Sequence, residues 1–165
     1  MVLRVLAILL AVALAAGCGG AGRLSAGQFR VKANRICSAQ KRKTNAFNAL
    51  NKQTLRRAID AVQTEIAQLE RLRPPASDVE RYRALLASYR RTLELIRRDG
   101  PQLVVLAREV ERAIPKRIGA FDKPPPHRYL VLSRRLREVT RPMNTAIRPA
   151  NVQARALGLR ECLVG

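Results

Sequence analysis

Apolar residues recur along most of this 165-residue chain at alternating intervals of three and four, the period that predicts amphipathic α-helices. The clearest stretch predicts a helix from about Thr54 to Leu72. Its apolar positions are Leu55, Ile59, Val62, Ile66 and Leu69. Such a heptad seam is typical of a helix that packs against near-parallel or antiparallel neighbours.

A second seam follows the pair Pro74-Pro75, which stops the preceding helix because neither residue donates a backbone hydrogen bond. Ser77 and Glu80 have the spacing of a capping box and are predicted to open this helix. Its apolar positions are Val79, Tyr82, Leu86, Tyr89, Leu93 and Ile96. It is predicted to end at Asp99-Gly100-Pro101, and apolar spacing resumes over residues 101–114 as either a separate helix or a kinked extension.

Two more helices are predicted nearer the ends of the chain. The first runs from about Ala26 to Leu50 and is opened by a capping box of Ser25 and Gln28. Its apolar positions are Phe29, Ala33, Ile36, Cys37 and Phe47. Residues 114–126 are rich in proline and predict one long irregular connection before the last helix.

The last helix is predicted to start near His127, and its apolar spacing continues without a break past Pro142 and Pro149. Both prolines lie off the apolar stripe, so we expect one bent helix rather than several short ones. Gly158 is placed for a left-handed C-cap, after which residues 159–162 fold back onto the bundle. The pattern as a whole predicts an all-α, antiparallel bundle of about four helices, the last kinked by its prolines.

The stretch Leu14-Ala15-Ala16-Gly17-Cys18 comes after Arg4 and the apolar segment Val5 to Ala16, the order of an export signal. It resembles the lipobox of bacterial lipoproteins, with its large aliphatic residue one place further from the cysteine than is commonest. The resemblance implies that a diacylglyceryl group is transferred to the Cys18 sulfur and that the chain is cut before it. The alternative, an uncleaved spanning helix, needs roughly 20 apolar residues, and this segment supplies twelve.

The predicted organisation is a lipoprotein signal peptide over residues 1–17, a flexible tether over 18–24 and a helical bundle domain over 25–165. Lipid on Cys18 would hold the mature chain at the extracytoplasmic face of the cell membrane.

Two further cysteines, Cys37 and Cys162, remain once Cys18 is assigned to lipid. Thiols of exported proteins are normally paired, so we infer a disulfide between the first helix and the tail that follows the last one. The alternatives are two free buried thiols or a metal site. The cysteines and the lone His127 fall short of the four ligands of a structural zinc site, so no metal is expected.

Three motifs of the mature chain carry a wider resemblance. They are Ala33-Asn34-Arg35-Ile36-Cys37, the run L-x-x-L-x-P-P-A over residues 69–76 with Tyr82-x-x-Leu85-Leu86 after it, and Ala156-Leu157-Gly158-Leu159-x-x-Cys162. The chain resembles uncharacterised helical lipoproteins of high-GC, actinobacterial-type bacteria. The resemblance implies the same helical architecture and brings no activity, cofactor or catalytic residue.

Charge adds one feature to this picture. The chain has 32 basic and 12 acidic residues for a net charge of +20, which becomes +19 when Arg4 is removed with the signal. Arginines recur in groups on the polar faces of the predicted helices. The candidate anion-binding residues are Arg56, Arg57, Arg90, Arg91, Arg97, Arg98, Arg134, Arg135 and Arg137. They would meet anionic lipid or cell-wall polymer; the alternative is a solvated face that keeps the protein soluble. Export and the lack of aromatics among these bases argue against nucleic acid.

Candidate catalytic groups are few. The lone His127 has no partner to position it as a base, so an enzyme is the least favoured class. Tyr82 and Tyr89 share the stripe of Leu86 and Leu93, which predicts core residues with hydroxyls toward the rim; the alternative is a ligand-stacking ladder.

The sequence therefore predicts a membrane-anchored binding or structural module without catalysis, with no cofactor and no identified protein partner. The alternative function is a small-ligand carrier or sensor with a pocket between the helices, where Pro142 and Pro149 would open the last one.

Overall fold

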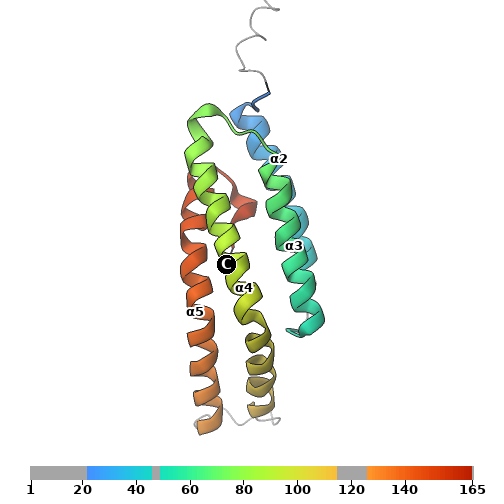
Figure 1. Cartoon of the computed structure of the whole chain (residues 1–165), viewed down its shortest axis with the longest axis vertical. Coiled ribbons are helices and arrows are strands. Elements are labelled where there is room, and N and C mark those ends of the chain that lie inside the picture. Colours follow the sequence, from blue (N-terminus) through green and yellow to red (C-terminus); the bar gives the residue numbers. More distant parts are fainter. Residues whose placement is uncertain (1–21, 46–48, 115–125, 165) are drawn as a thin grey trace, which may run out of the picture.

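Every element in the described part of the chain is helical (Figure 1). The structure is a computed structural model, and it describes residues 22–45, 49–114 and 126–164. The long helices are α2 (Ala26–Asn45), α3 (Lys52–Glu70), α4 (Val79–Ala113) and α5 (His127–Ala156), and the short 3-10 turns are η1 (Ala76–Asp78) and η3 (Arg160–Cys162). The predicted all-α helical bundle is confirmed. The predicted signal peptide, Cys18 and most of the predicted connection over 114–126 lie outside the described residues.

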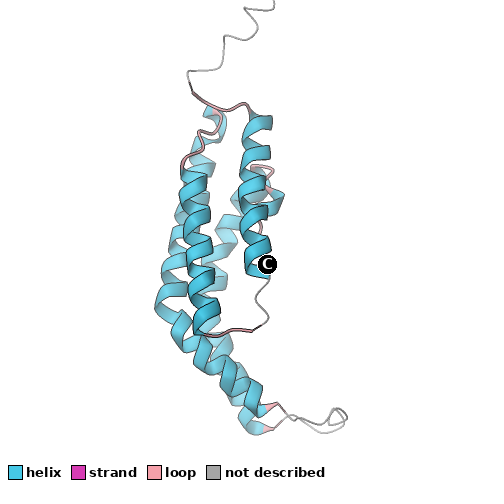
Figure 2. Ribbon diagram, turned by 90° about the vertical axis from the view of Figure 1, so that its right-hand side faces the viewer, coloured by secondary structure: helices cyan, strands magenta, loops and turns pink. Residues whose placement is uncertain are grey.

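Helices that follow one another in sequence run in opposite directions (Figure 1). α4 packs along α5, α3 packs on α4, and α2 packs on α3, while η3 returns the tail to α2. α4 and α5 continue past the ends of α2 and α3 as a pair, and this part is inclined to the rest of the bundle (Figure 2). We call residues 101–113 and 127–140 the distal hairpin.

The main apolar core lies in the other half of the bundle, between all the long helices and the tail. Its fully buried members include Phe29, Leu69, Leu85, Leu157 and Leu159. The distal hairpin has its own buried residues, which lie outside this main cluster. They are Val104, Leu106 and Leu132.

Of the two alternatives for residues 101–114, the extension is correct, because α4 continues through Gly100 and Pro101 to Ala113; the predicted helix end at residues 99–101 is therefore wrong. Pro101 is exposed, so its ring does not enter the core. Gly100 is buried against Leu55 of α3, where a Cβ would come within 2.8 Å of the leucine Cδ1. The glycine therefore allows two helices to approach closely, and packing against α5 carries the helix past the proline.

α5 passes without interruption through Pro142 and Pro149, as predicted. It ends in a Schellman motif around Gly158, whose φ is +71°. The amide of Leu159 donates to the Ala154 carbonyl at 2.8 Å, and the Gly158 amide donates to Arg155 at 3.0 Å. The predicted glycine C-cap is confirmed.

The helix starts follow the predictions in one case and depart from them in another. The Ser25–Gln28 capping box forms, with reciprocal hydrogen bonds of 3.3 and 3.2 Å. The predicted box of Ser77 and Glu80 does not form, because η1 precedes α4 and Glu80 pairs with an arginine of its own helix.

α3 starts two residues earlier than predicted because a capping box of Asn51 and Thr54 opens it. The Asn51 Oδ1 accepts from the Thr54 amide at 2.9 Å, and the Thr54 hydroxyl accepts from the Asn51 amide at 2.8 Å. α2 ends at Asn45 rather than Leu50, and residues 46–48 lie outside the described part.

Candidate functional site

The tail after α5 is joined to α2 by the predicted disulfide. Cys37 and Cys162 are both buried, and their Cα atoms lie 5.0 Å apart across a sequence separation of 125. Asn34, one turn before Cys37, accepts from the Glu161 amide at 3.0 Å and donates to the Gly158 carbonyl at 3.4 Å. Chain-entropy arguments assign a closed loop of this size about 5 kcal/mol of stabilisation. The bond therefore closes the bundle into one unit.

Tyr82 and Tyr89 are core residues, as predicted, with exposed fractions of 3% and 5%. The prediction that their hydroxyls reach the rim is wrong. Tyr82 donates to the Leu69 carbonyl at 2.6 Å, and Tyr89 donates to the carbonyl of Cys162. Tyr82 also meets Phe29 edge to face, with ring centroids 5.0 Å apart.

Burial raises the pKa of both tyrosines, and neighbouring carboxylates raise it further: Glu70 acts on Tyr82 and Glu65 on Tyr89. Both phenols are therefore protonated donors that fix main-chain carbonyls. Through these hydroxyl hydrogen bonds the two side chains hold the core together.

All nine candidate arginines are exposed, but the structure does not bring them to one site. They are spread along α3, α4 and α5. Arg90 binds Glu70 at 2.7 Å, and Arg97 donates to a glutamine of α3 at 2.7 Å. Arg98 pairs with Asp99, and its hydrogen bonds lower the pKa of that carboxyl.

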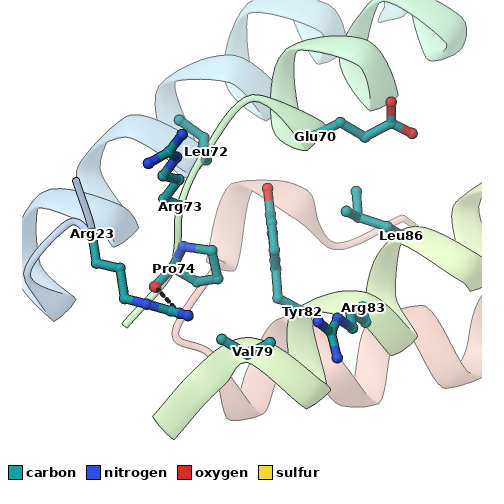
Figure 3. A pocket seen from close by; sticks show the side chains of 9 residues that line it. All are labelled: Arg23, Glu70, Leu72, Arg73, Pro74, Val79, Tyr82, Arg83 and Leu86. Carbon is teal, nitrogen blue, oxygen red and sulfur yellow. Dashed lines mark hydrogen bonds between the residues drawn. The ribbon is translucent and has the colours of Figure 1, made fainter. Parts of the chain in front are cut away.

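A cleft of about 470 Å³ lies where the N-terminal segment, the α3–α4 connection and the first turns of α4 meet (Figure 3). Its lining residues are Arg23, Glu70, Leu72, Arg73, Pro74, Val79, Tyr82, Arg83 and Leu86. Leucines, a proline and the tyrosine ring give it an apolar floor, and three arginines stand on its rim. We call it the N-terminal cleft.

The arginines of this cleft were not among the predicted site residues. They come from three separate stretches of sequence, so spacing along any one helix does not point to them. The one local signal is that Arg71 and Arg73 flank Leu72 directly before the proline pair.

Backbone and side-chain contacts fix the chain entering α2 against this cleft. The Leu24 amide donates to the Arg73 carbonyl at 3.0 Å, and Arg23 Nη1 donates to the Pro74 carbonyl at 3.3 Å (Figure 3). Gly22 has a φ of +93°, and a Cβ there would lie 2.6 Å from Arg73 Nη1. Arg23 and Leu24, the last residues of the predicted tether, thus belong to the bundle.

Glu65 of α3 is a half-buried carboxyl near Tyr89 of α4. It forms no ion pair with a described residue, and burial raises its pKa from 4.5 to about 7. No described side chain donates a hydrogen bond to the Glu65 carboxyl. The group is a source of pH-dependent stability.

Two smaller hollows lie along α3. One of about 290 Å³ is lined by residues of α2 and α3 and includes Gln40, whose Oε1 is buried without a hydrogen-bond partner. Another of about 450 Å³ is lined by α3 residues and Arg71, which follows them. None of these three hollows is lined by α5, where the two prolines were expected to open a pocket.

His127 is the first residue of α5 and is exposed. Across residues 22–45, 49–114 and 126–164, no three His, Cys, Asp or Glu side chains gather where they could hold a metal ion. Within the same ranges, no helix combines the length and apolar character needed to cross a membrane. Comparison with protein-family models, curated proteins and solved structures finds no match to this chain.

Proposed function

We propose that this chain is an exported lipoprotein, anchored through Cys18 at the extracytoplasmic face of the cell membrane. The support in the sequence is the export signal that ends in the box of residues 14–18. The disulfide between Cys37 and Cys162 adds support, because structural disulfides persist in oxidising compartments.

At this surface the bundle acts as a non-catalytic binding or structural module for anionic lipid or cell-wall polymer. The observation that carries this proposal is uncompensated charge: in the described part of the chain, ion pairs occupy three arginines, namely Arg83, Arg90 and Arg98. The guanidinium fork matches phosphate and carboxylate oxygens in pairs. Each base close to an anionic surface contributes about 1 kcal/mol.

Metabolic labelling with palmitate tests the anchor. Wild-type protein should take up label and fractionate with membranes, and Cys18→Ala should do neither. Unlabelled wild-type protein, or label retained by Cys18→Ala, would refute the lipoprotein assignment.

Retention on surfaces tests the binding role separately. Residues 18–165 with Cys18→Ser contain every described residue, so this chain keeps the whole core. It should be retained on anionic vesicles or cell-wall polymer, not on neutral vesicles, and retention should fall steeply as salt rises. Lack of retention at physiological salt would mean that the arginines serve solubility alone.

A further inference from the structure

We propose that the N-terminal cleft binds the headgroup of an anionic phospholipid in the membrane that carries the anchor. The inference rests on the proposed function, since it needs lipid on Cys18. It adds a named site, one class of ligand and an orientation of the bundle on the membrane.

Chain length places the cleft near the headgroups. Five residue steps separate Cys18 from Arg23, which the hydrogen bond to Pro74 fixes at the cleft. A fully extended chain spans at most about 18 Å over that distance. The headgroup layer is about 5–8 Å thick on each side of a bilayer. A lipid-modified Cys18 therefore holds this end of the bundle, and no other, beside the headgroups.

The charges of the cleft suit a phosphate. Glu70, the one carboxylate in the lining, is already bound by Arg90 at 2.7 Å. Arg83 is engaged only in an exposed pair with Glu80, and such pairs contribute little to stability. Arg23 and Arg73 form no ion pair with a described carboxylate. Three exposed guanidinium groups thus line the cleft and can bind phosphate oxygens.

The apolar floor selects an amphiphile over a purely polar polymer. Leu72, Pro74, Val79 and Leu86 line the cleft beside the ring of Tyr82 (Figure 3). A phospholipid presents a phosphate next to the glycerol and the first acyl carbons, which matches a basic rim over an apolar floor. A cell-wall polymer has the charge without the apolar portion.

The other arginines lie too far away to share this role. α4 starts beside the cleft and has 35 residues, which is about 50 Å of helix. The distal hairpin, which contains Arg134, Arg135 and Arg137, lies at the end of the molecule opposite the start of α4 (Figure 1). Electrostatic interactions in physiological salt decay over about 8 Å. The distal arginines therefore provide a matched control of equal charge.

Vesicle binding of the Cys18→Ser chain of residues 18–165 tests the site. The vesicles contain phosphatidylglycerol and phosphatidylcholine in equal parts, at physiological salt. One variant carries Arg23→Gln, Arg73→Gln and Arg83→Gln; its control carries Arg134→Gln, Arg135→Gln and Arg137→Gln. The cleft variant should lose about a hundredfold in affinity, and the control less than threefold. All six arginines are exposed, so the control variant should keep the wild-type unfolding temperature. The cleft variant also loses the exposed Arg23–Pro74 hydrogen bond and the exposed Arg83–Glu80 pair, so its unfolding temperature should fall by only a few degrees.

A fluorescence measurement tests the orientation independently, because the chain has no tryptophan of its own. Val79→Trp places a reporter in the cleft, and Val105→Trp places one on the exposed face of the distal hairpin. Anionic vesicles should shift the emission of Val79→Trp to the blue and leave Val105→Trp unchanged.

Three results would overturn the proposal. Equal losses in the two arginine variants would show that total charge, not the cleft, binds the membrane, and would leave the proposed function standing. Displacement by soluble glycerol phosphate at matched phosphate concentration would show a site for free phosphate. Binding to cell-wall polymer but not to vesicles would exclude the phospholipid and retain the anionic surface. Palmitate labelling reports independently whether the lipid anchor itself is present.

Discussion

The hydroxyl of Tyr89 on α4 donates a hydrogen bond to the main-chain carbonyl of Cys162, whose sulfur is bonded to Cys37 on α2. One residue of the tail is therefore held by two helices, through a covalent bond on one side and a buried hydrogen bond on the other. The tail also donates its own amide bonds within η3 and to Asn34. These contacts make the last residues part of the core.

Removing the disulfide and removing the Tyr89 hydroxyl should have non-additive effects on the free energy of unfolding. Cys37→Ala with Cys162→Ala should lower the free energy of unfolding by about 2–5 kcal/mol. Tyr89→Phe should cost about 1–2 kcal/mol, because a buried carbonyl loses its donor. Without the disulfide the Tyr89→Phe cost should shrink by at least about 0.5 kcal/mol, since the freed tail no longer presents the carbonyl. Urea unfolding measures all four proteins.

Tyr129→Phe is the matched control for this cycle, because Tyr129 is half-buried on α5 and forms no hydrogen bond to a described residue. It should change the free energy of unfolding by less than about 0.5 kcal/mol. Strictly additive losses in the cycle would contradict the coupling.

The apolar spacing alone was enough to predict the bundle, because helices with a heptad pattern of apolar residues pack side by side whatever loops connect them. It failed at Gly100 and Pro101, where local propensity favours a break. What overrides propensity there is a contact between residues far apart in sequence, Leu55 and Gly100, and single-sequence reasoning has no access to such a pair. The missed cap at Asn51 was a different error, since Asn-x-x-Thr is a readable but weaker form of the capping box.

The effect of Gly100→Ala on the free energy of unfolding should change sign when Leu55 is also replaced, as a double-mutant cycle would show. Gly100→Ala gains about 1 kcal/mol of helix propensity, but its Cβ would lie 2.8 Å from Leu55 Cδ1. Overpacking of this kind costs about 1–3 kcal/mol, so the single variant should be destabilised. In a Leu55→Ala background the clash is gone, and Gly100→Ala should stabilise by about 1 kcal/mol. Gly27→Ala, in open space on α2, is the control for propensity alone. A stabilising Gly100→Ala in the wild-type background would contradict the close approach.

Glu65 should make the bundle less stable as pH rises. Its folded-state pKa of about 7 lies above the ordinary value of 4.5. Between these values the folded state binds more protons than the unfolded state, so the free energy of unfolding falls as pH rises and levels off above pH 7. The full effect is about 3 kcal/mol.

Substitution isolates this group. Glu65→Gln should match the wild type at pH 4 and be more stable by about 3 kcal/mol at pH 8. Glu94→Gln removes an exposed carboxylate of α4 and should keep the wild-type pH profile. Unfolding midpoints across this pH range provide the measurement, and an unchanged slope in Glu65→Gln would show that another group titrates.

The candidate site was less predictable than the fold for a physical reason. A basic surface can be anticipated from composition, because charge must be solvated and therefore exposed. The N-terminal cleft depends instead on Arg23 and Arg83, residues far apart in sequence, lining the same hollow. Their positions follow from the contacts of residues 23–24 with the α3–α4 connection. The pairing of Cys37 with Cys162 could be predicted because only one pair remained once Cys18 was assigned to lipid.

The two halves of the molecule should open at different free energies. Val104 is buried in the distal hairpin outside the main cluster, whereas Leu85 is buried within it. Amides of residues 101–113 should therefore exchange through local opening, well below the free energy of global unfolding. Val104→Ala should accelerate exchange in the distal hairpin and also lower the protection of amides that exchange only by global unfolding, because its contacts are lost in both open states. Leu85→Ala should lower the protection of amides that exchange by global unfolding by about 2–5 kcal/mol and leave the local opening of the distal hairpin unchanged, since the main cluster stays folded in that opening. Equal protection along the whole of α4 would mean that the hairpin unfolds only with the core, and that its contacts with α5 are stronger than its few buried residues imply.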